Sequence, residues 1–279
     1  MYPFSFHQKK TVAETVTTKS NHADTKFLAG GQSLIGVMKL RLDKPSHLIN
    51  LDAIPELRGI HVDGTTLTIG AMTRHAEVAS SNDVRNTIPG LSQLAGLIAD
   101  RMVRNMGTIG GSVANNDPSA DYPAALLALN ATIITNQREI LADDFFLGMF
   151  ETALGANELI QAIRFKAPIK SAYAKFKHPA SRYAVVGVFI AQQINMVRVA
   201  VTGAGPSVFR IPSMEAVLSK NFLASELETI VISSDGLNSD FFADASYRAK
   251  LIQLMAMQAV QNAKWFLGIN NNLHRPYCL

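Results

Sequence analysis

Two glycine-rich stretches contain the residue types best suited to chemistry in this chain. Glycine has no Cβ, so its backbone can adopt left-handed conformations and approach a ligand closely. Successive backbone N–H groups can then converge on an anion such as a phosphate. The two stretches read Leu28-Ala29-Gly30-Gly31-Gln32-Ser33-Leu34 and Arg104-Asn105-Met106-Gly107-Thr108-Ile109-Gly110-Gly111-Ser112. Together they predict a binding site for a dinucleotide cofactor, which has two adjacent phosphates.

Hydrogen-bonding side chains accompany both stretches, so the pair is more informative than either stretch alone. Each stretch by itself is also typical of a tight turn. Gln32 and Ser33 belong to the first stretch, and Thr108 and Ser112 belong to the second. Asp121 follows and could accept hydrogen bonds from cofactor hydroxyls. Taken alone, the same position favours the N-cap of the helix expected after it.

Other cofactor and catalytic motifs are missing from the sequence. The second stretch is not the Gly-x-Gly-x-x-Gly of a dinucleotide-binding Rossmann unit, and neither stretch ends in the Gly-Lys-Ser/Thr of a P-loop. No Gly-x-Ser-x-Gly nucleophile elbow is found. The seven histidines show no metal-ligand spacing such as His-Glu-x-x-His. We therefore expect no catalytic residue and no metal ligand on this chain, and we expect the cofactor to supply the chemistry.

Composition and charge indicate an ordinary globular chain. Its 279 residues are 48% hydrophobic and 17% charged, and this length suggests two domains or one large one. The net charge of +4 comes without a basic run, so binding to nucleic acid has little support. No apolar run approaches the roughly 20 residues of a membrane helix. The single cysteine, Cys278, excludes an internal disulfide and an iron–sulfur site on this chain, and we expect a cytoplasmic protein without a signal peptide.

Hydrophobic periodicity places the two glycine stretches in an α+β chain. We predict one region over residues 1–167, with subdomains of about 1–55 and 56–167, and a second region over 168–279 after a linker at 168–171. The turn residues Asp63 and Gly64 predict a hairpin. Predicted strands include residues 1–6, 26–29, 57–62, 66–70, 159–166, 173–177, 185–194 and 196–203. Predicted helices include residues 11–19, 122–129, 213–219, 224–233 and 244–267, the last ending at Gly268.

Taken together, these motifs resemble the flavin-binding medium subunit of the molybdenum hydroxylases, the family of xanthine dehydrogenase, aldehyde oxidoreductase and aerobic carbon monoxide dehydrogenase. The resemblance covers almost the whole chain. Its further motifs are Met38-Lys39-Leu40-Arg41, Ile69-Gly70-Ala71-Met72-Thr73 and Asp117-Pro118-Ser119-Ala120-Asp121. The resemblance implies a two-part FAD-binding domain of the vanillyl-alcohol-oxidase (PCMH) type, followed by a small domain of antiparallel strands and helices.

The resemblance also implies roles for individual residues. Backbone amides of residues 29–34 and 109–111 would hold the FAD pyrophosphate, and Gly110→Val would abolish flavin retention by filling the space of the diphosphate. Asp121 is similar to an acidic residue on the polyol or ribose, and Lys177 to a basic residue that reaches the site from the C-terminal domain. Leu159 matches an apolar position near the flavin or adenine. The implied cofactor-binding residues are Leu28, Ala29, Gly30, Gly31, Gln32, Ser33, Leu34, Ala71, Thr73, Asn105, Thr108, Ile109, Gly110, Gly111, Asn115, Asp121, Leu159 and Lys177.

In function, the resemblance implies the electron-transfer subunit of a heteromeric oxidoreductase. A large subunit would hold the molybdenum cofactor, a small subunit would hold two-iron two-sulfur clusters, and the assembly would be a dimer of heterotrimers. Many relatives place an acidic residue a few positions past an arginine, whereas the run Arg182-Tyr183-Ala184 has none. This departure leaves the electron acceptor open. The alternatives are a stand-alone FAD-dependent reductase or oxidase of the same fold, a scaffold with structural flavin, and a nucleotide hydrolase without a P-loop.

Overall fold

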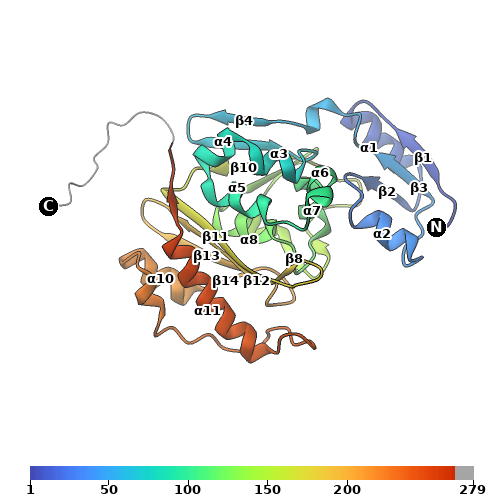
Figure 1. Cartoon of the computed structure of the whole chain (residues 1–279). Coiled ribbons are helices and arrows are strands. Elements are labelled where there is room, and N and C mark those ends of the chain that lie inside the picture. Colours follow the sequence, from blue (N-terminus) through green and yellow to red (C-terminus); the bar gives the residue numbers. More distant parts are fainter. Residues whose placement is uncertain (268–279) are drawn as a thin grey trace.

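The structure is a computed structural model that describes residues 1–267 (Figure 1). It has an α+β fold, with three main sheets that follow one another along the chain. Gly268, expected to end the last helix, and Cys278 lie outside the described residues. Among the described helices, none combines the length and the apolar composition needed to cross a bilayer.

The first sheet is small and parallel, and it lies at the blue end of the chain in Figure 1. Its strand order is β1 (Ser5–Gln8), β3 (His47–Asn50), β2 (Thr25–Leu28). Helix α1 (Val12–Asn21) connects β1 to β2, and α2 (Leu34–Lys39) follows the first glycine stretch. The predicted first strand was placed too early, because pairing with β3 begins only at the fifth residue.

The second sheet is antiparallel and contains the predicted hairpin. Strands β4 (Ile60–Asp63) and β5 (Thr66–Gly70) pair across a turn at Gly64 and Thr65, one residue later than predicted, and Gly64 has a φ of +57°, a conformation that favours glycine. The strand order is β4 (Ile60–Asp63), β5 (Thr66–Gly70), β10 (Ile160–Lys166), β6 (Thr132–Thr135), β7 (Glu139–Leu141). Between β5 and β6 come α3 (His75–Ser80), α4 (Asn82–Thr87), α5 (Pro89–Gly96), α6 (Arg101–Met106), α7 (Ile109–Asn115) and α8 (Tyr122–Ala128). After β7 come α9 (Ala142–Phe145), β8 (Phe146–Gly148) and β9 (Glu151–Thr152).

The third sheet is antiparallel and is formed by the C-terminal part of the described chain. Helices α10 (Pro212–Lys220) and α11 (Ala245–Gln261) lie against it, in orange and red at the bottom of Figure 1. The strand order is β14 (Phe209–Arg210), β13 (Val197–Thr202), β12 (Ala184–Gln192), β11 (Lys170–Lys177), β15 (Lys264–Trp265).

Three sequence predictions in this part are wrong. The helix predicted over residues 224–233 is only a single 3-10 turn, Ala224–Leu227. The last helix ends at Gln261 instead of residue 267, because the chain then turns and Lys264 pairs with Ser171 at the edge of the sheet. The expected linker at 168–171 is shorter than predicted, since Lys170 and Ser171 already belong to β11.

One hydrophobic core extends across the border between the second and third sheets. Leu91 and Leu94 of α5 belong to the same buried cluster as Tyr173 and Phe189 of the third sheet. A second cluster lies under α10 and α11, and a smaller one joins the first sheet to the second. We propose that the chain divides into two regions at residue 168, because the sheets before and after this position have no strand in common. The shared core means that the two regions stabilise each other.

Candidate functional site

A cavity of about 880 Å³ lies where the three parts of the structure meet. This volume is near the upper end of the range typical of ligand sites, about 300–1,000 Å³. Its walls come from the end of α1 and strand β2, from both glycine stretches, from the residues before β10, and from a loop after β11. The lining residues fall within 19–43, 51, 71–75, 98–121, 150–160 and 181–183. The cavity is thus formed by segments far apart in the sequence.

The two glycine stretches touch through their backbones. A Cβ built on Gly30 would lie 2.1 Å from the carbonyl oxygen of Met106 and 2.7 Å from Cα of Gly107. The neighbouring Gly31 has a φ of +72°, which side-chain-bearing residues rarely adopt. Glycine is therefore required at this contact, and the two stretches form one continuous wall of the cavity.

The backbone amides of residues 30–33 have no protein hydrogen-bond acceptor within residues 1–267. Residues 30–33 all line the cavity. Backbone N–H groups need a partner when water is displaced from them, and a run of neighbouring N–H groups in a loop suits the oxygens of an anion. This wall therefore fits a ligand with phosphate groups.

The second stretch differs from the expectation because its amides already have protein partners. The N–H of Ile109 donates to the carbonyl oxygen of Thr73 at 3.0 Å, and the N–H of Gly110 donates to that of Ala71 at 2.8 Å. The N–H of Gly111 donates to Oγ1 of Thr108, the N-cap of α7, at 3.2 Å. Amides 109–111, which were expected to hold a diphosphate, thus donate to protein acceptors in this structure. The bonds from Ile109 and Gly110 attach the second stretch to the residues that follow β5.

The physical reason expected for the effect of Gly110→Val also needs correction. A Cβ on Gly110 would lie 2.5 Å from Cβ of Ala71 and 2.7 Å from its carbonyl oxygen. A valine would therefore collide with the backbone beside β5 before it filled any ligand space. The glycine is needed for close packing of α7 on the second sheet.

Asp121 lies in the cavity wall and is held by two residues of the third sheet. Its carboxylate accepts a hydrogen bond from the hydroxyl of Tyr173 and forms an ion pair with Nζ of Lys175 at 2.9 Å. Only 2% of the Lys175 side chain and 5% of the Asp121 side chain are exposed. Burial raises the pKa of Asp121, while Lys175 and Tyr173 oppose this shift. Asp121 stands at the N-cap position of α8, as the N-cap interpretation predicted, but its side chain makes no capping hydrogen bond there.

Lys177, the lysine expected at the site, is exposed and does not line the cavity. Residues two apart on a strand normally share a face, so Lys175 and Lys177 could not be distinguished by spacing. The pairing of β11 with β12 shifts its register between Phe176 and Lys177. Such a bulge redirects the side chain that follows it. The C-terminal region instead reaches the cavity through Ser181, Arg182 and Tyr183, which follow β11.

Most of the predicted site residues lie together, and some do not. The implied residues that line the cavity are Ala29, Gly30, Gly31, Gln32, Ser33, Leu34, Ala71, Thr108, Gly110, Gly111, Asn115, Asp121 and Leu159. The implied residues outside the lining are Leu28, Thr73, Asn105, Ile109 and Lys177. Thr73 is buried and bonds through Oγ1 to the backbone of Gly59, so it braces β5 from behind the wall. Asn105 is exposed on α6.

Among the titratable lining residues that sequence reasoning missed, His75 and Glu158 have strongly shifted pKa values. His75 is 5% exposed, and burial lowers its pKa to about 4, with a smaller contribution from Arg104. Burial disfavours the charged form of Glu158, but hydrogen bonds from Arg138, the Gly155 amide and Thr135 lower its pKa to about 2. Neither residue stands in a recognisable motif, so only the fold identifies them. At neutral pH the lining therefore holds a neutral imidazole and a carboxylate with its own protein partners.

Comparisons with known proteins agree with this geometry. Residues 2–167 match the family described as the FAD binding domain in molybdopterin dehydrogenase. The chain is 35% identical to the carbon monoxide dehydrogenase medium chain of Hydrogenophaga pseudoflava, covering 94% of this chain and 97% of that one. It is 32% identical to the glyceraldehyde dehydrogenase medium chain of Sulfolobus acidocaldarius, covering 93% and 98%. The structure matches a chain of reconstituted CO dehydrogenase from Oligotropha carboxidovorans with a TM-score of 0.85 and 32% identity, covering 94% and 98%.

Proposed function

The chain belongs to the family of FAD-binding domains found in molybdopterin dehydrogenases, and from this premise we propose that it is the electron-exit subunit of a heteromeric molybdenum hydroxylase. It is a flavoprotein component of an oxidoreductase, and its cofactor is FAD. Electrons would reach it from iron–sulfur clusters on a partner subunit and leave it for an external acceptor.

The observation that supports this proposal most strongly is the cavity wall made by the two glycine stretches. The backbone amides of residues 30–33 lie beside the backbone contact between Gly30 and Met106. A dinucleotide cofactor needs such a wall, because its two phosphates have many acceptor oxygens and no donor.

When bound, FAD supplies redox chemistry that the side chains of the protein cannot perform. The residues of this chain bind and orient it. We propose that the amides of residues 30–33 hold the diphosphate, and that Asp121 accepts a hydrogen bond from a hydroxyl group of the cofactor. Lys175 and Tyr173 keep the Asp121 carboxylate in place from the opposite side. Apolar residues such as Leu159 exclude water from the ring system.

The partners are proposed from the relatives. Relatives named medium chains belong to carbon monoxide and glyceraldehyde dehydrogenases, and another is named the nicotine 6-hydroxylase medium subunit. A medium chain implies a larger and a smaller one. We propose that the large partner holds the molybdenum cofactor, that the small one holds two-iron two-sulfur clusters, and that two such trimers form the cytoplasmic assembly.

The test is the composition of the native assembly. We expect the purified complex to contain three polypeptides, with molybdenum and iron in fixed ratio to FAD, and we expect substrate to bleach the flavin absorbance only when all three are present. A chain that purifies alone with FAD and is reduced directly by a small-molecule donor would contradict the proposal. That result would support a stand-alone reductase or oxidase.

A further inference from the structure

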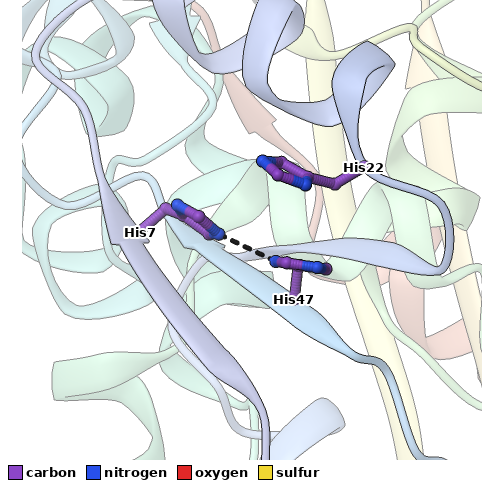
Figure 2. Close-up of side chains that lie close together, drawn as sticks. All are labelled: His7, His22 and His47. Carbon is purple, nitrogen blue, oxygen red and sulfur yellow. Dashed lines mark hydrogen bonds between the residues drawn. The ribbon is translucent and has the colours of Figure 1, made fainter.

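Three histidines from separate segments meet on the first sheet, away from the cofactor cavity. His7 lies in β1, His22 follows the last residue of α1, and His47 begins β3 (Figure 2). Each offers a ring nitrogen, and these nitrogens all lie within 4.8 Å of one another. None of the three residues lines the cofactor cavity. The cluster is therefore a separate feature, which the function proposed above does not use.

The backbone holds the three rings together. His47 is the register partner of Ser5, and His7 stands two residues further along β1, so both side chains lie on the same face of the sheet. The loop after α1 is fastened to the beginning of β3, because the N–H of Ser46 donates to the carbonyl oxygen of Asp24 at 3.0 Å. Oγ1 of Thr25 also donates to the carbonyl oxygen of His22 at 2.7 Å. His22 thus lies beside His47 as a consequence of the fold.

The rings are close enough to share one ion. Nε2 of His7 lies 2.9 Å from Nδ1 of His47, where one ring donates a hydrogen bond to the other. The centroids of the His22 and His47 rings are 4.3 Å apart. Nitrogens within 4.8 Å of each other have a common point within about 2.8 Å of each, against a zinc–nitrogen distance of about 2.0–2.1 Å. Rotation about the Cβ–Cγ bonds, whose minima are broad for histidine, closes this difference.

The chemistry of the donor set selects the kind of ion. All three donors are imidazole nitrogens, and no carboxylate or thiolate of the described chain joins them. Imidazole suits zinc, copper and nickel, whereas calcium and magnesium require oxygen ligands. Metal binding requires neutral rings with free lone pairs, and His7 and His47 already lie in hydrogen-bond contact through Nε2 and Nδ1.

We propose that His7, His22 and His47 form a binding site for one divalent transition-metal ion of the zinc class. The ion replaces the shared proton between His7 and His47 and takes a nitrogen from each ring. Its remaining coordination position is left for water. Bound in this way, it ties the end of α1 to the edge strand β1 and stabilises the first sheet.

The test is metal binding by the full chain, prepared without a polyhistidine tag and stripped with a chelator. Zinc is titrated by calorimetry, and cobalt is added separately because its visible absorption reports nitrogen coordination. We expect one zinc per chain and a higher melting temperature with zinc. We expect His47→Ala to weaken binding by about tenfold or more and to remove the shift in melting temperature. His61→Ala is the matched control, because His61 is exposed on β4 and outside the cluster.

His7→Ala is the second variant, because His7 lies on an edge strand and its removal disturbs packing least. It must also weaken zinc binding, even if His47→Ala fails to fold. No zinc binding at about 1 mM, a range typical of weak association, would overturn the proposal. Unchanged affinity in His7→Ala, or equal losses in His7→Ala and His61→Ala, would overturn it as well. The cluster would then be only a hydrogen-bonded stack of rings.

Discussion

The ammonium group of Lys175 lies 2.9 Å from the carboxylate of Asp121, with both side chains almost fully buried. Asp121 belongs to the wall of the cofactor cavity, whereas Lys175 belongs to the third sheet. This ion pair therefore couples the region that binds FAD to the C-terminal region. A buried charge that loses its partner is strongly destabilising, about 3–5 kcal/mol in typical cases.

Lys175→Met is accordingly expected to lower the free energy of unfolding by about 3 kcal/mol, because Asp121 keeps its buried carboxylate without a cation. Urea unfolding at pH 7 measures the change. Lys177→Met is the control, since Lys177 is exposed and its loss is expected to change stability by less than about 0.5 kcal/mol. The double variant Lys175→Met/Asp121→Asn should recover part of the loss. Equal effects of Lys175→Met and Lys177→Met would contradict the assignment of the buried ion pair to Lys175.

Gly30→Ala is expected to reduce the FAD content of the purified protein severely. Its Cβ would lie 2.1 Å from the carbonyl oxygen of Met106, so the two glycine stretches would have to separate. Flavin absorbance relative to protein gives the result directly. Gly36→Ala is the matched control, because a Cβ there meets nothing within 4 Å. Full FAD content in Gly30→Ala would show that the contact between the stretches is not needed.

His75 is expected to make the protein sensitive to mild acid. Its pKa is about 4 in the folded state, against 6.5 for an unperturbed histidine, so the unfolded state binds the proton more readily. Stability should therefore be unaffected above pH 6.5 and should fall as the pH drops from 6.5 to 4, by up to about 3 kcal/mol. In His75→Gln, the melting temperature should depend less on pH between pH 4 and pH 6.5, as a series of thermal melts would show. The exposed His61→Gln should leave the slope unchanged, and a slope that persists in His75→Gln would contradict the prediction.

Glu158 is expected to make the free energy of unfolding depend on pH in a more acidic range than His75 does. Its pKa is lowered from 4.5 to about 2, so its contribution is present above pH 4.5 and is lost as the pH falls towards 2. Glu158→Gln should destabilise the protein at pH 7 by about 2 kcal/mol, allowing for the half-exposed Arg138. The difference from the wild type should vanish near pH 2. Chemical unfolding at several pH values measures it, and a difference that is independent of pH would rule out the carboxylate as its cause.

The glycine stretches could be predicted from the sequence because glycine itself marks them. The positive φ of Gly31 is a local property that favours glycine, whereas the close approach of Gly30 to Met106 is a tertiary contact that the glycine permits. The choice between Lys175 and Lys177 could not be predicted, since it depends on a register shift in β11. The amide partners of α7 also depend on the position of β5, which is a tertiary contact.

The histidine cluster illustrates the same limit. Metal-ligand motifs are recognised by short spacings along the chain. His7, His22 and His47 are far apart in the sequence. His7 and His47 meet because β1 and β3 are neighbours in the first sheet, and His22 joins them because the loop after α1 is bonded to the beginning of β3. The expectation of no metal ligand was based on spacing alone. The spacing of the three histidines along the chain therefore gave no sign that their rings would lie close together in the fold.

A structure of the chain with its bound FAD would show whether the first glycine stretch holds the cofactor. We expect oxygens of the diphosphate to accept hydrogen bonds from the backbone amides of residues 30–33, at about 2.9 Å. We also expect the amides of Ile109 and Gly110 to keep their bonds to Thr73 and Ala71. A diphosphate held elsewhere, with the amides of residues 30–33 facing only water, would contradict this expectation.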